Sequence, residues 1–88
     1  MKIIHQNQRF EYSENGYIAY LSYVLDGEIR VFNHTIVPPE LGGRGVGKLL
    51  AQHALDYARE QHWQIRVTCD FVAAFVEKNP QYLDLLVE

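Results

Sequence analysis

Cysteine, basic residues and long apolar runs are all scarce in this sequence. The 88-residue chain has one cysteine, Cys69, so it cannot form an internal disulfide, which favours a cytoplasmic protein over a disulfide-stapled secreted one. Eight Lys and Arg stand against eleven Asp and Glu, and this net charge of −3 argues against a nucleic-acid partner. No apolar run could cross a membrane and no signal-peptide pattern is visible, so we expect no membrane association. The scattered His and Cys residues lack metal-ligand spacing, and no metal site is expected.

The first half of the chain has the pattern of an antiparallel meander. The hydrophobic share is 48%, and the length suits one domain over residues 1–88. A short strand is expected within residues 1–6, and three more over residues 9–37. The turns Asn15-Gly16 and Asp26-Gly27 would separate those three, because their residues tolerate positive φ. The middle strand, residues 17–25, is so rich in aromatic and branched residues that both of its faces should be covered.

The second half changes to a helical period. Pro38-Pro39 ends the last strand of the meander, and a helix is predicted from Arg44 to about Gln61. A strand over residues 63–69 follows, and then a helix over residues 71–78 that Asp70 would cap and Asn79-Pro80 would end. The final residues suggest one more helical turn. The strands on either side of the first helix should pair in parallel, which gives an α/β protein with a mixed sheet.

A glycine-rich loop, Gly42-Gly43-Arg44-Gly45-Val46-Gly47, joins the last meander strand to the first helix. The first N–H groups of a helix lack intrahelical partners, and glycines let an anion approach them closely. Arg44 and Lys48 add positive charge, so a pyrophosphate is the ligand that we expect. The spacing matches neither a P-loop nor a Rossmann fingerprint. The alternative is a plain turn that lets helix and sheet pack closely.

The loop and its surroundings resemble the GNAT superfamily of N-acyltransferases, whose acetyl-CoA pyrophosphate loop has Gln or Arg, two residues, Gly, one residue, then Gly or Ala. Gly45-Val46-Gly47 matches the second half of that motif. The runs "HTIVPPELGGRGVGKLL" and "CDFVAAFVEKNPQYLDLL" are similar to motifs of small GNAT-like proteins that carry little beyond the CoA-binding core. The resemblance covers about Asn33 to Leu86, and it implies a minimal GNAT fold: the meander, then strand, helix, strand, helix.

The sequence departs from these motifs at two positions. Gly42 stands where the superfamily usually has Gln or Arg, so a side-chain contact to the phosphates is lost there. Asp70 stands where the small relatives usually have Pro after the cysteine.

The resemblance implies that acyl-CoA lies between the strand ending at Val37 and the strand ending at Cys69. Pantetheine amides would pair with the backbone of Thr35, Ile36 and Val37. The pyrophosphate would rest on the loop and the start of the helix, and Phe71 would line the gap. The implied cofactor-binding set is therefore Thr35, Ile36, Val37, Gly43, Arg44, Gly45, Val46, Gly47, Lys48 and Phe71.

Two side chains are candidates for the chemistry. Cys69 precedes a helix N-terminus, which favours the thiolate form of a cysteine, and could accept an acetyl group; the alternative is a buried structural residue. His34 can accept a proton near neutral pH, and simple alternation places it on the same face as Phe32 and Ile36. Its alternative is a hydrogen-bonded histidine of the sheet. Glu40 is a weaker candidate base.

The function that the resemblance implies is an acetyl-CoA-dependent N-acetyltransferase. An amine of a protein or of a small molecule would receive the acetyl group, directly or through an acyl-cysteine. One alternative is a CoA-binding module without catalysis, and another is an interaction domain that has lost CoA.

Overall fold

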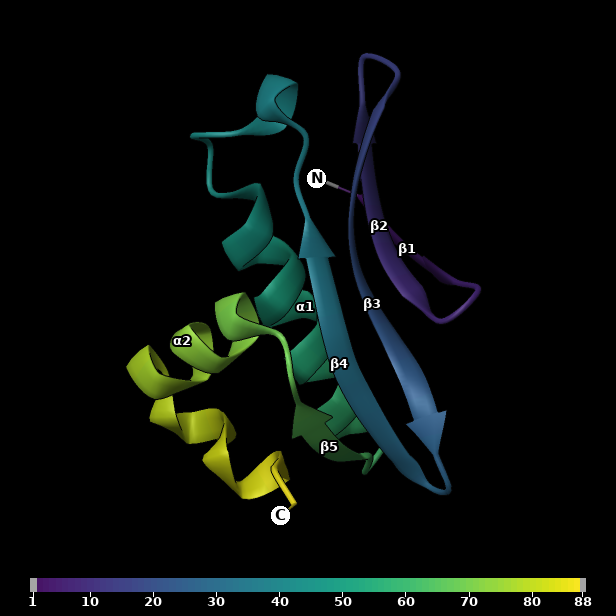
Figure 1. Cartoon of the computed structure of the whole chain (residues 1–88), viewed down its shortest axis with the longest axis vertical. Helices are drawn as coiled ribbons and strands as arrows, with labels where there is room; N and C mark the ends of the chain where they lie inside the picture. The colour runs from purple at the N-terminus through teal and green to yellow at the C-terminus, as the bar shows by residue number, and fades with distance from the viewer. Residues whose placement is uncertain (1, 88) are drawn as a thin grey trace.

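The computed structural model describes residues 2–87 and contains one five-stranded mixed sheet with the strand order β1-β2-β3-β4-β5 (Figure 1). The strands are β1 (Ile3–Gln6), β2 (Arg9–Glu14), β3 (Tyr17–Asp26), β4 (Ile29–Ile36) and β5 (Gln64–Val67). The helices are α1 (Val46–Glu60) and α2 (Asp70–Lys78), with short 3₁₀ helices η1 (Pro39–Leu41) and η2 (Pro80–Leu85).

Strands β1 to β4 form the expected antiparallel meander, and β4 pairs with β5 in parallel. At the turn between β2 and β3, Asn15 and Gly16 both have positive φ, 52° and 82°, as a type I′ hairpin turn requires. The α/β class, the mixed sheet and the order of elements are confirmed. The strand that was predicted over residues 63–69 is shorter than expected, since β5 covers only Gln64–Val67.

Helix α1 packs on one face of β2 and β3. Its buried stripe repeats at helical spacing and meets the inward residues of the sheet, including Phe10, Leu21 and Phe32, which are fully buried. Burial of a large apolar side chain of this kind contributes roughly 1.5–3 kcal/mol. This continuous core fixes α1, and with it the loop that precedes α1, against the sheet.

The expectation that both faces of β3 are covered is wrong. Ala19, Leu21 and Tyr23 point into the core, but Ile18 and Val24 on the opposite face are 49% and 46% exposed. Aromatic and branched residues favour strands whether or not a second layer covers them, so composition alone did not distinguish the two cases.

The C-terminal segment is held against α1 and β5. The hydroxyl of Tyr82 in η2 donates to Asp56 of α1 at 2.7 Å, and Arg59 of α1 pairs with Asp84 at 2.8 Å. Val87 then donates its N–H to the carbonyl of Ile65 in β5.

Among the helices within residues 2–87, none has both the length and the apolar character that a membrane span needs.

Candidate functional site

The glycine loop enters α1 through a left-handed residue. Gly45 is the N-cap of α1 with φ of 76°, and Gly43 has φ of 74°, a conformation that costs other residues about 1–2 kcal/mol. No side chain caps this helix, so the N–H groups of its first turn receive no side-chain acceptor. The helix therefore starts at Val46, two residues later than predicted, and presents the positive end of its dipole to the loop.

Gly47 lies against the ring of Phe71 from α2. A Cβ atom added at Gly47 would stand 2.8 Å from Cζ of Phe71, which is closer than such atoms approach. The absence of a side chain thus lets the start of α2 dock on the start of α1. Phe71 remains 41% exposed, so its ring covers the first turn of α1 without being enclosed.

These elements surround a shallow cavity of about 260 Å³, which we name the loop hollow. It contains seven of the predicted cofactor-binding residues: Val37, Gly43, Gly45, Val46, Gly47, Lys48 and Phe71. Leu41 and Gly42 complete its lining. A larger cavity of about 790 Å³ between β5, α2 and the C-terminal segment contains no predicted site residue.

Arg44 is directed away from the loop hollow and is not among its lining residues. Its guanidinium nitrogen Nη2 lies 2.7 Å from Oε2 of Glu14, at the end of β2. The hydroxyl of Tyr12 donates to the same carboxylate. These two hydrogen bonds, that of Tyr12 first, hold the pKa of Glu14 below its usual value. Lys48 is the cation that lines the hollow.

Strands β4 and β5 separate before β4 ends. Their last paired residues are Phe32 and Val67, and the N–H groups of Thr68 and Cys69 both turn to the carbonyl of Phe32, at 3.0 and 3.2 Å. In Figure 1, β4 continues beyond the short β5 while the chain after β5 leaves for α2. Within residues 2–87, the edge of β4 beyond Phe32 therefore has no strand beside it on the β5 side.

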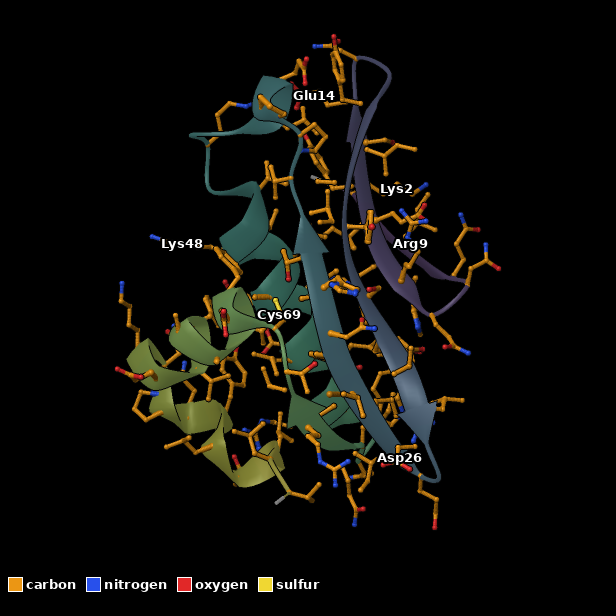
Figure 2. All side chains as sticks on the ribbon, in the orientation of Figure 1. Lys2, Arg9, Glu14, Asp26, Lys48 and Cys69 are labelled. Atoms are coloured by element: carbon orange, nitrogen blue, oxygen red, sulfur yellow. The ribbon has the colours of Figure 1, made fainter. Side chains whose placement is uncertain are left out.

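The side chain of Cys69 lies in this separation. Figure 2 shows Cys69 at the start of α2. Its sulfur is 3.4 Å from Oγ1 of Thr35 in β4, and the residue is 9% exposed. Cys69 is itself the N-cap of α2, and no side chain caps that helix, so the predicted cap by Asp70 is wrong. Asp70 is the first residue of α2, where a carboxylate still interacts favourably with the helix dipole.

The predicted orientation of His34 is also wrong. A β-bulge shifts the pairing of β3 with β4: Tyr23 faces Phe32, whereas Ser22 faces His34, so Asn33 is an extra residue. Phe32 is therefore buried, while His34 is exposed and Ile36 is 47% exposed. Thr35, and not His34, faces Cys69. Glu40 is exposed in η1.

Sequence reasoning missed Glu14 and the contact between Thr35 and Cys69. Neither gives a local signal in the sequence, because each depends on which strands lie side by side.

The residue spacing in the sequence predicted no metal site. Within residues 2–87, no group of three His, Cys, Asp or Glu residues is placed to hold a metal ion.

A mixed sheet in which two parallel strands separate, with a glycine loop opening the crossover helix, is the fold that the motifs predict. A family model described as GCN5-related N-acetyl-transferase matches residues 9–85, and the chain belongs to this family. The NMR solution structure of a GCN5-like protein from Staphylococcus aureus matches with a TM-score of 0.75 and 32% identity, covering 98% of this chain and 87% of that one.

Curated relatives share the name Protein NATD1. The one from Mus musculus is 37% identical over 98% of this chain and 84% of its own length. The one from Xenopus tropicalis is 34% identical over 98% of this chain and 85% of its own length. The match to the Bos taurus protein is shorter, at 46% identity over 60% of this chain and 49% of that protein. These names state no substrate.

Proposed function

We propose that this protein binds acetyl-CoA and transfers the acetyl group to a primary amine. The observation that carries the proposal is the position of two features along one strand. Val37, just after β4, lines the loop hollow, and Thr35, two residues earlier, contacts Cys69. A ligand held along the free edge of β4 would therefore have its phosphates at the loop and its other end at Cys69.

The residues present suit coenzyme A. At Gly43 and Gly45 no atom lies within 4 Å of the place that a Cβ would take, so the loop that enters α1 is open to a phosphate, and Lys48 adds a positive charge. The backbone of Thr35, Ile36 and Val37 offers amide groups at an unpaired strand edge, where an extended amide chain can pair. Arg44 would contribute to CoA binding by fixing the conformation of the loop and not by contacting the phosphates, because its guanidinium is paired with Glu14.

When bound, acetyl-CoA supplies an acetyl group that is activated as a thioester. The chain's part is to place that group at the strand edge, where fixed N–H donors can stabilise negative charge on its oxygen. The acceptor amine attacks the carbonyl carbon and releases CoA as a thiol. We propose an amine carried by a large molecule such as a protein, because within residues 2–87 the edge of β4 beyond Phe32, where the acetyl group would lie, has no strand beside it on the β5 side.

A covalent route through Cys69 is the second form of the same proposal. In it, the Cys69 sulfur bonds to the acetyl carbon, the bond from that carbon to the CoA sulfur breaks, and the thiol proton leaves with CoA. The acceptor nitrogen then takes the acetyl group, loses a proton and restores the thiol.

A cytoplasmic location also belongs to the proposal, since a single reduced cysteine suits that compartment.

The competing function is CoA binding without catalysis. It is favoured by the orientation of His34, since the candidate base is exposed on the face away from Thr35 and Cys69. A base that acts on the acceptor must come within hydrogen-bond reach of its proton.

Thermal unfolding with millimolar acetyl-CoA tests binding first. A ligand that binds only the native state raises the melting temperature, so an unchanged melting temperature would sink both functions. Release of free CoA thiol in the presence of lysine-containing peptides then separates the transferase from the binding module. Intact mass after incubation tests the covalent route: an added acetyl group that disappears in Cys69→Ala supports it, and CoA release by Cys69→Ala at the wild-type rate refutes it.

A further inference from the structure

A second cavity continues from the loop hollow along α2. It has a volume of about 320 Å³ and is lined by Lys48, Phe71, Ala74, Phe75, Lys78 and Asn79; we name it the lysine hollow. Lys48 and Phe71 line both cavities, so the two hollows meet at these side chains. A ligand that places a phosphate in the loop hollow can therefore extend into the lysine hollow.

The lysine hollow contains cations without acidic partners. Four arginines of the described chain form ion pairs, with Glu11, Glu14, Asp84 and Asp26, and Arg30 lies over the ring of Trp63. Among residues 2–87, Lys48 and Lys78 take part in no ion pair, and no carboxylate lines the cavity that they share. Figure 2 shows Lys48 projecting from the side of the molecule where α2 lies. This local excess of positive charge in an acidic chain suits an anion.

The remaining lining is aromatic. Phe71 exposes 41% of its surface, and Phe75 is half-buried and stacks on Tyr82 with 6.1 Å between ring centroids. Ala74 adds no bulk between them on the exposed side of α2. Flat apolar surface beside two ammonium groups is the combination that a nucleoside phosphate requires, because the base can stack while the phosphate meets the cations.

We propose that the lysine hollow binds the adenosine 3′-phosphate end of CoA, with Lys78 and Lys48 contacting the 3′-phosphate. The inference rests on the proposed binding of CoA. In CoA the ribose separates the pyrophosphate from the 3′-phosphate, so a ligand whose pyrophosphate occupies the loop hollow carries a second phosphate beyond it. That phosphate monoester bears a charge of about −1.5 to −2 at neutral pH, for which two unpaired lysines are suited. The chain thereby discriminates CoA from its 3′-dephospho form.

The test compares the dissociation constants of CoA and 3′-dephospho-CoA by calorimetry. We expect the wild-type protein to prefer CoA by about tenfold, as one net charge-assisted hydrogen bond would produce. Lys78→Gln should lose most of this preference by weakening CoA while leaving 3′-dephospho-CoA unchanged, and Lys78→Arg should keep it. Lys2→Gln is the matched control, because it removes the same charge from the far side of the molecule (Figure 2) and should bind as the wild type does.

Other outcomes separate this inference from the proposed function. Equal affinity of the wild-type protein for both ligands would overturn the 3′-phosphate site and leave CoA binding intact. Equal weakening of both ligands by Lys78→Gln, at an unchanged melting temperature, would likewise overturn it, since Lys78 would then act elsewhere on the ligand. Binding of neither ligand by the wild-type protein would overturn the proposed function as well.

Discussion

The guanidinium of Arg44 lies 2.7 Å from the carboxylate of Glu14, so the glycine loop is tied to the turn between β2 and β3. Both side chains are partly exposed, 49% and 30%, and such pairs contribute about 0–1 kcal/mol. The pair is thus weak enough to be exchanged for a phosphate. While it is formed, Lys48 and not Arg44 is the cation that lines the loop hollow.

Replacing Glu14 should release Arg44 toward the loop hollow. We expect Glu14→Gln to raise CoA affinity by about two- to fivefold, with a stronger dependence on salt and little change in stability. Calorimetric titrations at two salt concentrations would measure this. Glu11→Gln is the control, because it removes a carboxylate of β2 that pairs with Arg9 instead. Weaker binding by Glu14→Gln would mean that the ion pair orders the loop for the ligand.

Adding one methyl group at Gly47 should impair binding more than folding. Alanine in a helix is favoured over glycine by about 1 kcal/mol, which offsets the cost of about 1 kcal/mol for moving a ring at the surface. The displaced Phe71 ring would still disturb both hollows. We predict that Gly47→Ala leaves the urea midpoint nearly unchanged and lowers CoA affinity by about tenfold.

A double-mutant cycle with Phe71→Ala checks this explanation. The affinity loss caused by Gly47→Ala should shrink once the ring is absent. An equal loss in both backgrounds would show that the added methyl group blocks the ligand itself.

Gly42 is the loop position at which a side chain should improve binding. Its φ is −73°, and an added Cβ would lie 3.3 Å from the carbonyl oxygen of Pro39, so only a small adjustment is needed. Gly42→Arg should raise CoA affinity by about threefold or more, because it supplies the side chain usual in the superfamily. Gly43→Arg, at φ of 74°, should instead cost about 1–2 kcal/mol in stability. If the wild-type protein already binds CoA tightly and Gly42→Arg binds it no more tightly, the backbone N–H groups of the loop are sufficient to hold the phosphates.

Stability should decline in mild acid because of His5. Its ring stacks on Phe10 with centroids 4.4 Å apart, and Nε2 lies 2.8 Å from the hydroxyl of Tyr23. Burial, and next the nearby His53, hold the pKa of His5 below 6.5. As pH falls, the unfolded chain therefore binds this proton before the folded chain does, and the free energy of unfolding decreases until the folded pKa is passed.

Urea unfolding between about pH 7.5 and 5 would measure this slope. His5→Phe keeps a ring on Phe10 but cannot titrate, so its stability should change less with pH. His34→Gln removes an exposed histidine of the sheet and is the matched control. An equal slope in His5→Phe and the wild-type protein would contradict the assignment to His5.

Most of the fold could be predicted because local rules act on short stretches. Asn15-Gly16 formed its turn since both residues tolerate positive φ, and α1 formed where apolar residues recur at helical spacing. The start of α1 was placed too early at Arg44, because left-handed Gly45 stops the helical backbone there.

The candidate site was predicted less completely. The loop residues other than Arg44 did gather in one hollow. Alternation along β4 failed at the bulge, where Asn33 is inserted and Ser22 donates a hydrogen bond to its side chain. A bulge depends on the neighbouring strand, so counting residues along β4 gave the wrong face for His34.

By itself, the sequence determined the order of the elements, the glycine loop that opens α1 and the place of Cys69 between a strand and a helix. These features depend on backbone preferences and apolar spacing, which act within a few residues. Only the tertiary structure decided which side chains meet. The pairing of Arg44 with Glu14, the contact of Thr35 with Cys69, and the shared cavity of Lys48 and Lys78 arise from strand register and helix packing, which long-range burial of the core sets.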